Sequence, residues 1–198
     1  ATNEKKRMMW SCNTAAMSYQ SLGQYDSAFI WNRKAMQMAY ELELPVWRGI
    51  ISGNMGQIYY ELKNYDSAQA LLQTGYQISA KEKLFDNAAN SLQWAARTNI
   101  QSGNNLAALQ QVREALAILK NDRHADYLRN TFYTATEVFK ALGEYDSAFY
   151  YNTKYGALND SLERVVALSG IAVSKARAIN ENNRYSIQSL QKEKEKQV

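Results

Sequence analysis

The residues whose side chains could take part in catalysis or bind a metal ion are few and scattered. His124 is the only histidine and Cys12 the only cysteine among 198 residues. A metal site needs several ligands at suitable spacing, and a catalytic site needs a convergent acid, base and nucleophile. No such cluster is visible, so we expect His124 to be solvated or helix-capping and Cys12 to be a core thiol. The sequence predicts no catalysis, no metal and no cofactor.

A serine and an aspartate recur in a short motif, which raises the question of a repeated Ser/Asp site. The copies that begin at Leu22, Leu62 and Leu142 all end in Tyr-Asp-Ser-Ala, and a diverged copy begins at Ser102. A fixed long period is typical of solenoids, whose units pack on their neighbours. Capping and packing at a helix start therefore explain the motif better than catalysis. The alanines that close the copies recur at one constant spacing: Ala28, Ala68, Ala108 and Ala148.

Composition favours a helical fold and disfavours several functional classes. The chain has one proline, nine glycines and 46% hydrophobic residues, which suits long helices around a shared core. The net charge is +4, and residues 175–198 supply +3 of it with six Lys/Arg against three Asp/Glu. The nearly neutral body gives no clustered basic surface for nucleic acid. No apolar run is long enough for a membrane helix, and no signal peptide is visible.

Turn residues divide each repeat into two antiparallel helices. Pro45 can open a helix, Asn64 falls at an N-cap, and Asp86 can cap the first helix of the third unit. Three glycines fall where a left-handed residue ends a helix: Gly23, Gly103 and Gly143. Helices are therefore predicted at residues 4–21, 25–42, 46–62, 65–82, 86–101, 105–120, 124–141 and 145–158, with a long helix from about residue 160.

The second unit carries the clearest family pattern. Met55-Gly56 and Tyr59 lie on its first helix, and Tyr65 and Ala68 open its second. On these residues the sequence resembles the tetratricopeptide repeat family. The resemblance implies an all-α solenoid of about four 40-residue helix-turn-helix units with a long C-terminal helix. The usual repeat of this family is shorter, so longer helices are expected here. The solenoid would cover residues 1–158, with units at about 4–42, 46–82, 86–120 and 124–158.

The resemblance also implies a binding groove, because these proteins bind extended peptides along their first helices. Amide and aromatic side chains dominate the corresponding positions, and they suit peptide backbone groups and apolar anchors. A dense Lys/Arg clamp for a terminal carboxylate is missing. A solvated concave face without a ligand is the alternative. The expected groove residues are Trp10, Asn13, Met17, Gln20, Gln57, Tyr60, Asn90, Gln93, Arg97, Asn130, Tyr133, Glu137 and Lys140.

Residues 159–198 are expected to form a C-terminal capping helix and a polar stalk. Apolar residues between Leu162 and Val173 recur at helical spacing and suit the exposed end of the fourth unit. Beyond Ala178 the apolar content thins. This part is expected to be a solvated helix, one strand of a weak coiled coil that would pair two copies, or a stalk toward a membrane.

The tail carries a second, narrower resemblance. Leu158-Asn159-Asp160-Ser161-Leu162-Glu163 and the final Gln191-Lys192-Glu193-Lys194-Glu195-Lys196 are similar to the end of the sensor segment in Bacteroidota-type membrane-anchored regulators. This resemblance implies a periplasmic sensor that binds a protein or peptide. Its output would be a histidine kinase or a helix-turn-helix domain outside this sequence, which looks like a piece of a longer protein. A soluble cytoplasmic adaptor for protein-complex assembly is the alternative function.

Overall fold

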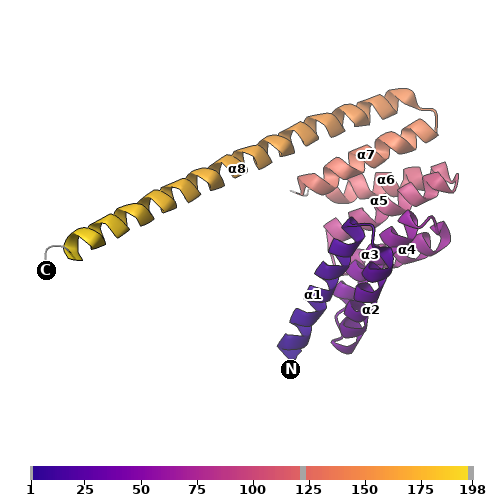
Figure 1. Cartoon of the computed structure of the whole chain (residues 1–198). Helices are drawn as coiled ribbons and strands as arrows, with labels where there is room; N and C mark the ends of the chain where they lie inside the picture. The colour runs from indigo at the N-terminus through magenta and orange to yellow at the C-terminus, as the bar shows by residue number, and fades with distance from the viewer. Residues whose placement is uncertain (1, 121–123, 196–198) are drawn as a thin grey trace. The chain divides into compact units, whose positions relative to one another are not determined.

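The computed structural model describes residues 2–120 and 124–195, with side chains described as far as residue 181. Over these residues the chain forms eight α-helices (Figure 1), which confirms the all-α fold with a long C-terminal helix. The helices pair along the chain as first and second helices of four units. Their bounds are α1 (Thr2–Ser21), α2 (Tyr25–Glu41), α3 (Pro45–Glu61), α4 (Tyr65–Lys81), α5 (Phe85–Gln101), α6 (Asn105–Leu119), α7 (Ala125–Ala141) and α8 (Tyr145–Glu195).

Left-handed residues end the first helices, as predicted. Gly23 has φ 70°, and Gly103 and Gly143 both have φ 77°. After α1, the backbone N–H of Gln24 donates to Tyr19 O at 2.9 Å, which satisfies a carbonyl of the last turn. Lys63 adopts the same conformation at φ 59°, although it lacks the freedom of glycine.

Two of the three predicted helix starts are confirmed. Pro45 is the first residue of α3, where its missing N–H costs nothing. The side-chain oxygen of Asn64 accepts a hydrogen bond from Ser67 N at 3.2 Å. The predicted cap at Asp86 is wrong: Leu84 is the N-cap of α5, and Asp86 lies in the first turn. A carboxylate in this turn still interacts favourably with the positive end of the helix.

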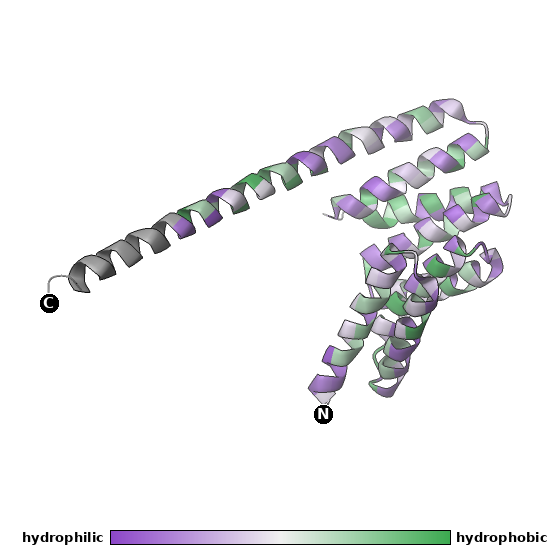
Figure 2. Ribbon diagram, viewed as in Figure 1, coloured by the Kyte–Doolittle hydropathy of each residue, from purple (hydrophilic) through white to green (hydrophobic). Residues whose placement is uncertain are grey.

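Small residues allow the two helices of a unit to pack closely. The four evenly spaced alanines that close the motif copies are all buried. A Cβ at Gly56 would lie 2.7 Å from Leu72 Cγ, and a Cβ at Gly75 would lie 3.0 Å from Gly53 N. The backbones of α3 and α4 are therefore nearly in contact. Figure 2 shows hydrophobic and hydrophilic residues interspersed along the helices.

The first helices of successive units contact one another and form one side of the solenoid. These contacts run from α1 to α3, from α3 to α5 and from α5 to α7. The second helices α2, α4 and α6 are farther apart, and Tyr76 of α4 reaches Glu114 of α6 through long side chains. The side formed by α1, α3, α5 and α7 is therefore the inner side of the stack.

The predicted break between residues 158 and 160 is wrong, because α8 is one helix of 51 residues. No proline interrupts it, and Asn159 Nδ2 donates to Glu163 Oε1 at 2.8 Å across the expected break. The chain divides into two compact units, Ala1–Tyr155 and Gly156–Val198. Within the second, several apolar side chains are exposed: Val165, Val166, Leu168, Ile171, Val173 and Ile179. Among the described helices, none is long and apolar enough to cross a membrane.

Candidate binding face

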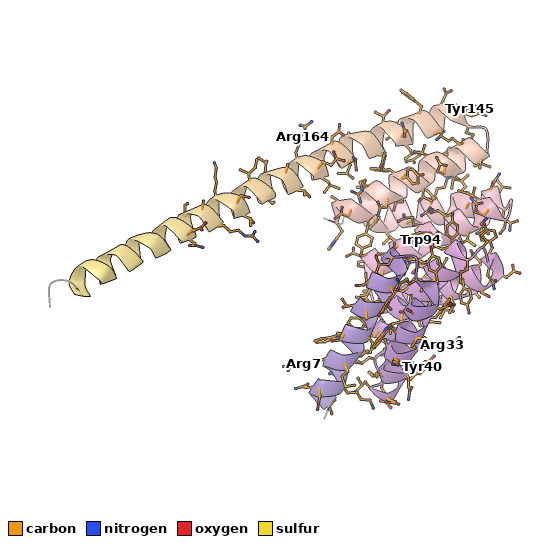
Figure 3. The ribbon with its side chains drawn as sticks, viewed as in Figure 1. Arg7, Arg33, Tyr40, Trp94, Tyr145 and Arg164 are labelled. Carbon is orange, nitrogen blue, oxygen red and sulfur yellow. The ribbon has the colours of Figure 1, made fainter. Side chains whose placement is uncertain are left out.

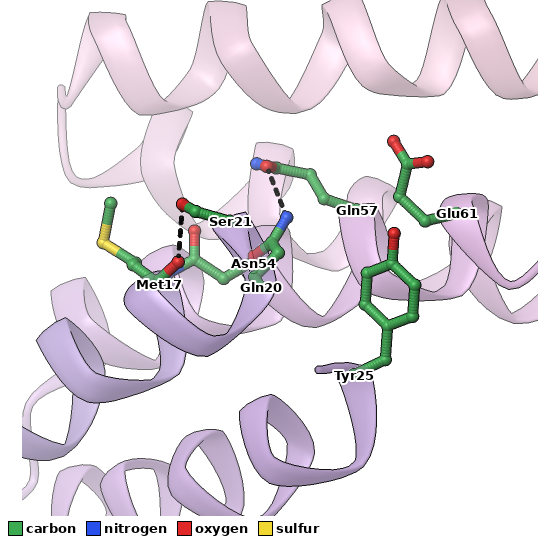
Figure 4. A pocket seen from close by; sticks show the side chains of 7 residues that line it. All are labelled: Met17, Gln20, Ser21, Tyr25, Asn54, Gln57 and Glu61. Atoms are coloured by element: carbon green, nitrogen blue, oxygen red, sulfur yellow. Dashed lines mark hydrogen bonds between the residues drawn. The ribbon is translucent and has the colours of Figure 1, made fainter. Parts of the chain in front are cut away.

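The inner face, as we use the term, is the exposed surface of α1, α3, α5 and α7 together with the side chains that border it. Two hollows open on it. The first has a volume of about 400 Å³ and lies between α1 and α3 (Figure 4). Its lining residues are Met17, Gln20, Ser21, Tyr25, Asn54, Gln57 and Glu61.

Amide side chains connect α1 and α3 at this first hollow. Gln20 Nε2 donates to Gln57 Oε1 at 3.4 Å, as Figure 4 shows. Asn54 Nδ2 donates to Asn13 Oδ1 at 3.1 Å, and Asn13 Nδ2 lies 3.6 Å from Met17 Sδ. Each amide retains donors or acceptors beyond these single bonds, so the pairs can also bond a ligand's backbone.

The second hollow has a volume of about 210 Å³ and lies across α3, α5 and α7. The Arg97 guanidinium lies 4.2 Å from the centre of the Trp94 ring and 5.1 Å from the centre of the Tyr60 ring. Those two rings meet edge to face at 5.3 Å. The residues that line it are Tyr60, Arg97, Ile100, Gln101, Tyr133 and Glu137.

The charges in this second hollow are arranged unevenly. Glu137 Oε1 accepts from Lys140 Nζ at 3.0 Å, so an ammonium group already balances this carboxylate. Arg97 is held by ring stacking and forms no ion pair with any residue that the structure describes. Cation–π contacts of this kind fix the plane of a guanidinium and leave its N–H edge free to donate.

The structure brings together about half of the residues expected in the groove. Met17, Gln20 and Gln57 line the first hollow, and four others line the second: Tyr60, Arg97, Tyr133 and Glu137. Asn13 does not line the first hollow but is hydrogen-bonded to its lining residue Asn54.

The remaining five expected residues line neither hollow. Trp10 packs against Trp47 at 6.2 Å between ring centres. Gln93 is only 5% exposed, and its side-chain oxygen is buried without a hydrogen-bond partner in the described structure. Asn130 accepts a hydrogen bond from Arg129 Nε at 3.2 Å. Asn90 is half-buried, and Lys140 is exposed at the edge.

Several residues that line or border the two hollows escaped the sequence-based assignment. Asn54 and Trp94 are equivalent positions of α3 and α5, and each follows directly after a position of the transferred pattern, Gly53 and Gln93. Glu61 lies at the last turn of α3, which the shorter family repeat does not reach. Asn54 and Trp94 lie one period apart, and this recurrence of polar or aromatic residues could have indicated from the sequence that both positions border the groove.

The isolated chemical groups of the sequence lie apart from the two hollows. His124 Nδ1 lies 3.2 Å from Asp86 Oδ2, and the His124 side chain is 56% exposed, so the histidine is solvated as expected. Its side chain makes no capping hydrogen bond at the start of α7. Cys12 is buried in the core. Within residues 2–120 and 124–181, no group of three His, Cys, Asp or Glu side chains could hold a metal ion.

Comparison with known proteins finds a family resemblance in the first two helix pairs. Residues 7–81 match the family model of the tetratricopeptide repeat. This part of the chain is similar in sequence to tetratricopeptide repeats. The match spans the first two helix pairs, and the same helix-pair geometry continues through α5, α6 and α7. No curated protein sequence matches the chain.

Two solved structures share this tetratricopeptide-like fold. Aspartyl phosphate phosphatase F from Bacillus subtilis matches with a TM-score of 0.71 and 18% identity, over 85% of this chain and 43% of that one. BtubC (BKLC) from P. vanneervenii matches with a TM-score of 0.66 and 18% identity, over 78% of this chain and 64% of that one. At such identities the likeness shows the fold alone. The chain spans less than two thirds of either structure.

Proposed function

We propose that the inner face binds an extended protein or peptide segment, which lies along both hollows. The observation that carries the proposal is the joint arrangement of amide pairs at the first hollow and an aromatic–arginine cluster at the second. Tetratricopeptide repeats over residues 7–81 support a protein-binding role, because repeat solenoids present such concave surfaces.

The first hollow is suited to the backbone of a bound segment. The Gln20–Gln57 hydrogen bond is long at 3.4 Å, so a peptide N–H or C=O can replace it at little cost. The Asn13–Asn54 bond beside it is shorter at 3.1 Å and keeps the neighbouring amides in place. This hollow therefore fixes the orientation and register of the bound segment more than it selects the amino-acid sequence of that segment.

The second hollow is suited to an anchoring side chain. Tyrosine, tryptophan and arginine are the residue types that contribute most at protein interfaces. Tyr133 is 43% exposed and packs against Tyr155 at 5.6 Å between ring centres, which leaves one side of its ring open. Because the Arg97 guanidinium is stacked and has no described anionic partner, the anchor includes an acidic group.

Peptide selection against the full chain tests this proposal. A random peptide library should yield binders enriched in acidic residues, and the double variant Arg97→Ala, Tyr133→Ala should weaken them about tenfold or more. The matched control is Arg33→Ala, Tyr40→Ala, which removes the same residue types from α2 (Figure 3). Equal loss of binding in both variants, or none in either, would contradict the assignment to the inner face.

We further propose that the chain is the sensor portion of a membrane-anchored signalling regulator, on the periplasmic side. The resemblance of residues 158–163 and 191–196 to such regulators supports this role. The parent gene provides the test. About 20 consecutive apolar residues soon after Val198 are expected, since a membrane span needs that length. A polar continuation would favour the cytoplasmic adaptor instead.

A further inference from the structure

The two hollows of the inner face carry opposite charges. Among the described residues that line the first hollow, Glu61 alone is charged at neutral pH. In the second hollow the Lys140 ammonium balances the Glu137 carboxylate, so the Arg97 guanidinium leaves a net positive charge. The inner face is therefore negative on one side of α3 and positive on the other.

The Glu61 carboxylate lies where a positive group is favoured. It is exposed, and it forms no hydrogen bond or ion pair with any residue that the structure describes. Glu61 is the last residue of α3, where the helix dipole presents its negative end, and the last turn of α3 holds no basic residue. Figure 4 shows Glu61 beside Tyr25 at one end of the first hollow, with Met17 at the other end. A cation bound here would interact with the carboxylate and with the helix end together.

The repeat shows that packing requires neither charge. The positions that correspond to Glu61 in the other units are uncharged: Ser21, Gln101 and Ala141. The position of Arg97 is occupied by Gln57 one period earlier, so an amide is accepted there as well. Each charge therefore belongs to one place on the inner face, where a ligand can use it.

The two charges do not neutralise each other. Helices α3 and α5 are in contact, and the ring of Tyr60, the residue before Glu61, lies 5.1 Å from the Arg97 guanidinium. The stacked guanidinium forms no ion pair with Glu61 or with any other residue in the described part of the chain. Neighbouring helices thus present a half-buried cation and an exposed anion, and each is open to a partner of opposite charge.

We propose that the segment bound to the inner face is dipolar, with a basic residue at Glu61 and an acidic residue at Arg97. This inference rests on the proposed function and adds the charge pattern of the partner. An extended chain rises about 3.3 Å per residue and directs alternate side chains to the same side. Packed helices lie roughly 8–10 Å apart, so the two charged residues of the segment are about two or four positions apart.

This pattern separates the partner from a uniformly acidic one. An acidic residue at Glu61 would place like charges together at the end of α3, which disfavours binding. A basic residue at Arg97 is disfavoured in the same way. The segment that fits both hollows therefore carries both charges, which balance each other over this stretch.

Peptide selection against the full chain and against a charge-reversal variant tests this pattern. Peptides selected on the wild type from a random library should pair Lys or Arg with Asp or Glu at the separation given above. On Glu61→Lys, a second acidic residue should replace the basic one, because the charge in the first hollow is reversed. The matched control is Glu43→Lys, before the other end of α3, which should select the wild-type pattern. This exposed turn residue has φ 51°, and its counterpart Lys83 has φ 59°, so the turn accepts lysine.

The affinity of one selected peptide gives a second measurement. Replacement of its basic residue by glutamine should weaken binding to the wild type about threefold or more. The same replacement should leave binding to Glu61→Gln unchanged, and Gln101 shows that the fold accepts glutamine at this position. Circular dichroism checks that all variants remain helical.

The outcomes distinguish this inference from the proposed function. Enrichment of acidic residues without a paired basic residue, or the same pattern on Glu61→Lys, would overturn the inference and leave the acidic anchor at Arg97 intact. Binders that are indifferent to Arg97→Ala, Tyr133→Ala, or a library that yields no binders, would refute the proposed function and this inference with it.

Discussion

At the residue scale, the hydrogen bond between Tyr76 and Glu114 connects the second helices of neighbouring units. The Tyr76 hydroxyl donates to a Glu114 carboxylate oxygen. This bond, with burial and the carboxylate charge as smaller causes, raises the pKa of Tyr76 from 10.0 to about 12. The folded state therefore holds this proton at pH values where the unfolded chain releases it.

A pH dependence follows from that raised pKa. The stabilising contribution is fully present below pH 10 and is lost as the pH rises from 10 toward 12. Urea denaturation between pH 8 and pH 12 should show a steeper alkaline loss of unfolding free energy in the wild type than in Tyr76→Phe. Parallel curves for the two proteins would show that Tyr76 does not titrate with folding.

Individual site residues were only partly predictable from the sequence. Tyr60, Arg97 and Tyr133 line one hollow, because their spacing is about one helical turn short of a full repeat and keeps them on one side of successive first helices. Gln93 is buried instead of lining the groove. The repeats of this family are shorter than those of this chain. A position transferred from the shorter repeat can therefore face a different direction on the longer helix, and only the packed structure shows which direction it faces.

At the element scale, capping is uneven among the second helices. Asn64 caps α4 through its side chain, whereas Asn104 at the start of α6 forms no side-chain cap. The same residue type therefore offers a matched pair. Asn64→Ala should lower the unfolding free energy by about 1 kcal/mol, and Asn104→Ala by clearly less. Chemical denaturation measures both, and an equal loss would contradict the assigned role of the Asn64 side chain.

Glycines determine how closely α3 and α4 approach. A Cβ at Gly75 would lie 3.0 Å from Gly53 N and 3.1 Å from Gly49 O, both backbone atoms that cannot move aside alone. Gly75→Ala should therefore destabilise the fold by about 1–3 kcal/mol through overpacking. Gly156→Ala is the control, because no atom lies within 4 Å of its added Cβ. Thermal melts should show a lower Tm for the first variant only; two unchanged melts would disprove the close approach.

Helix boundaries were largely predictable, and the reasons are local. Gly23 and Pro45 carry backbone preferences that terminate or open helices wherever they occur. The continuity of α8 was missed, because the period indicated a unit end near residue 158. The Asn159 side chain donates a hydrogen bond to Glu163 along the helix there. Contacts of this kind within a helix are not visible in the repeat period, which is why the period alone gave the wrong boundary.

At the scale of the whole solenoid, each unit packs only against its neighbours, so a core defect should remain local. Leu72 is fully buried, and Leu72→Ala should cost about 2–5 kcal/mol. Hydrogen exchange should then accelerate in α3, α4 and α5, with α7 keeping its protection. Uniform loss of protection through α7 would indicate a single cooperative core instead of stacked pairs.

Binding along the inner face is the central claim, and a footprint of a bound peptide tests it most directly. A peptide selected against the full chain and fitted with a photoreactive group should crosslink to α1, α3, α5 and α7, including residues beside Gln57 and Arg97. Crosslinks confined to α2, α4 and α6, or spread evenly over both sides, would contradict the account.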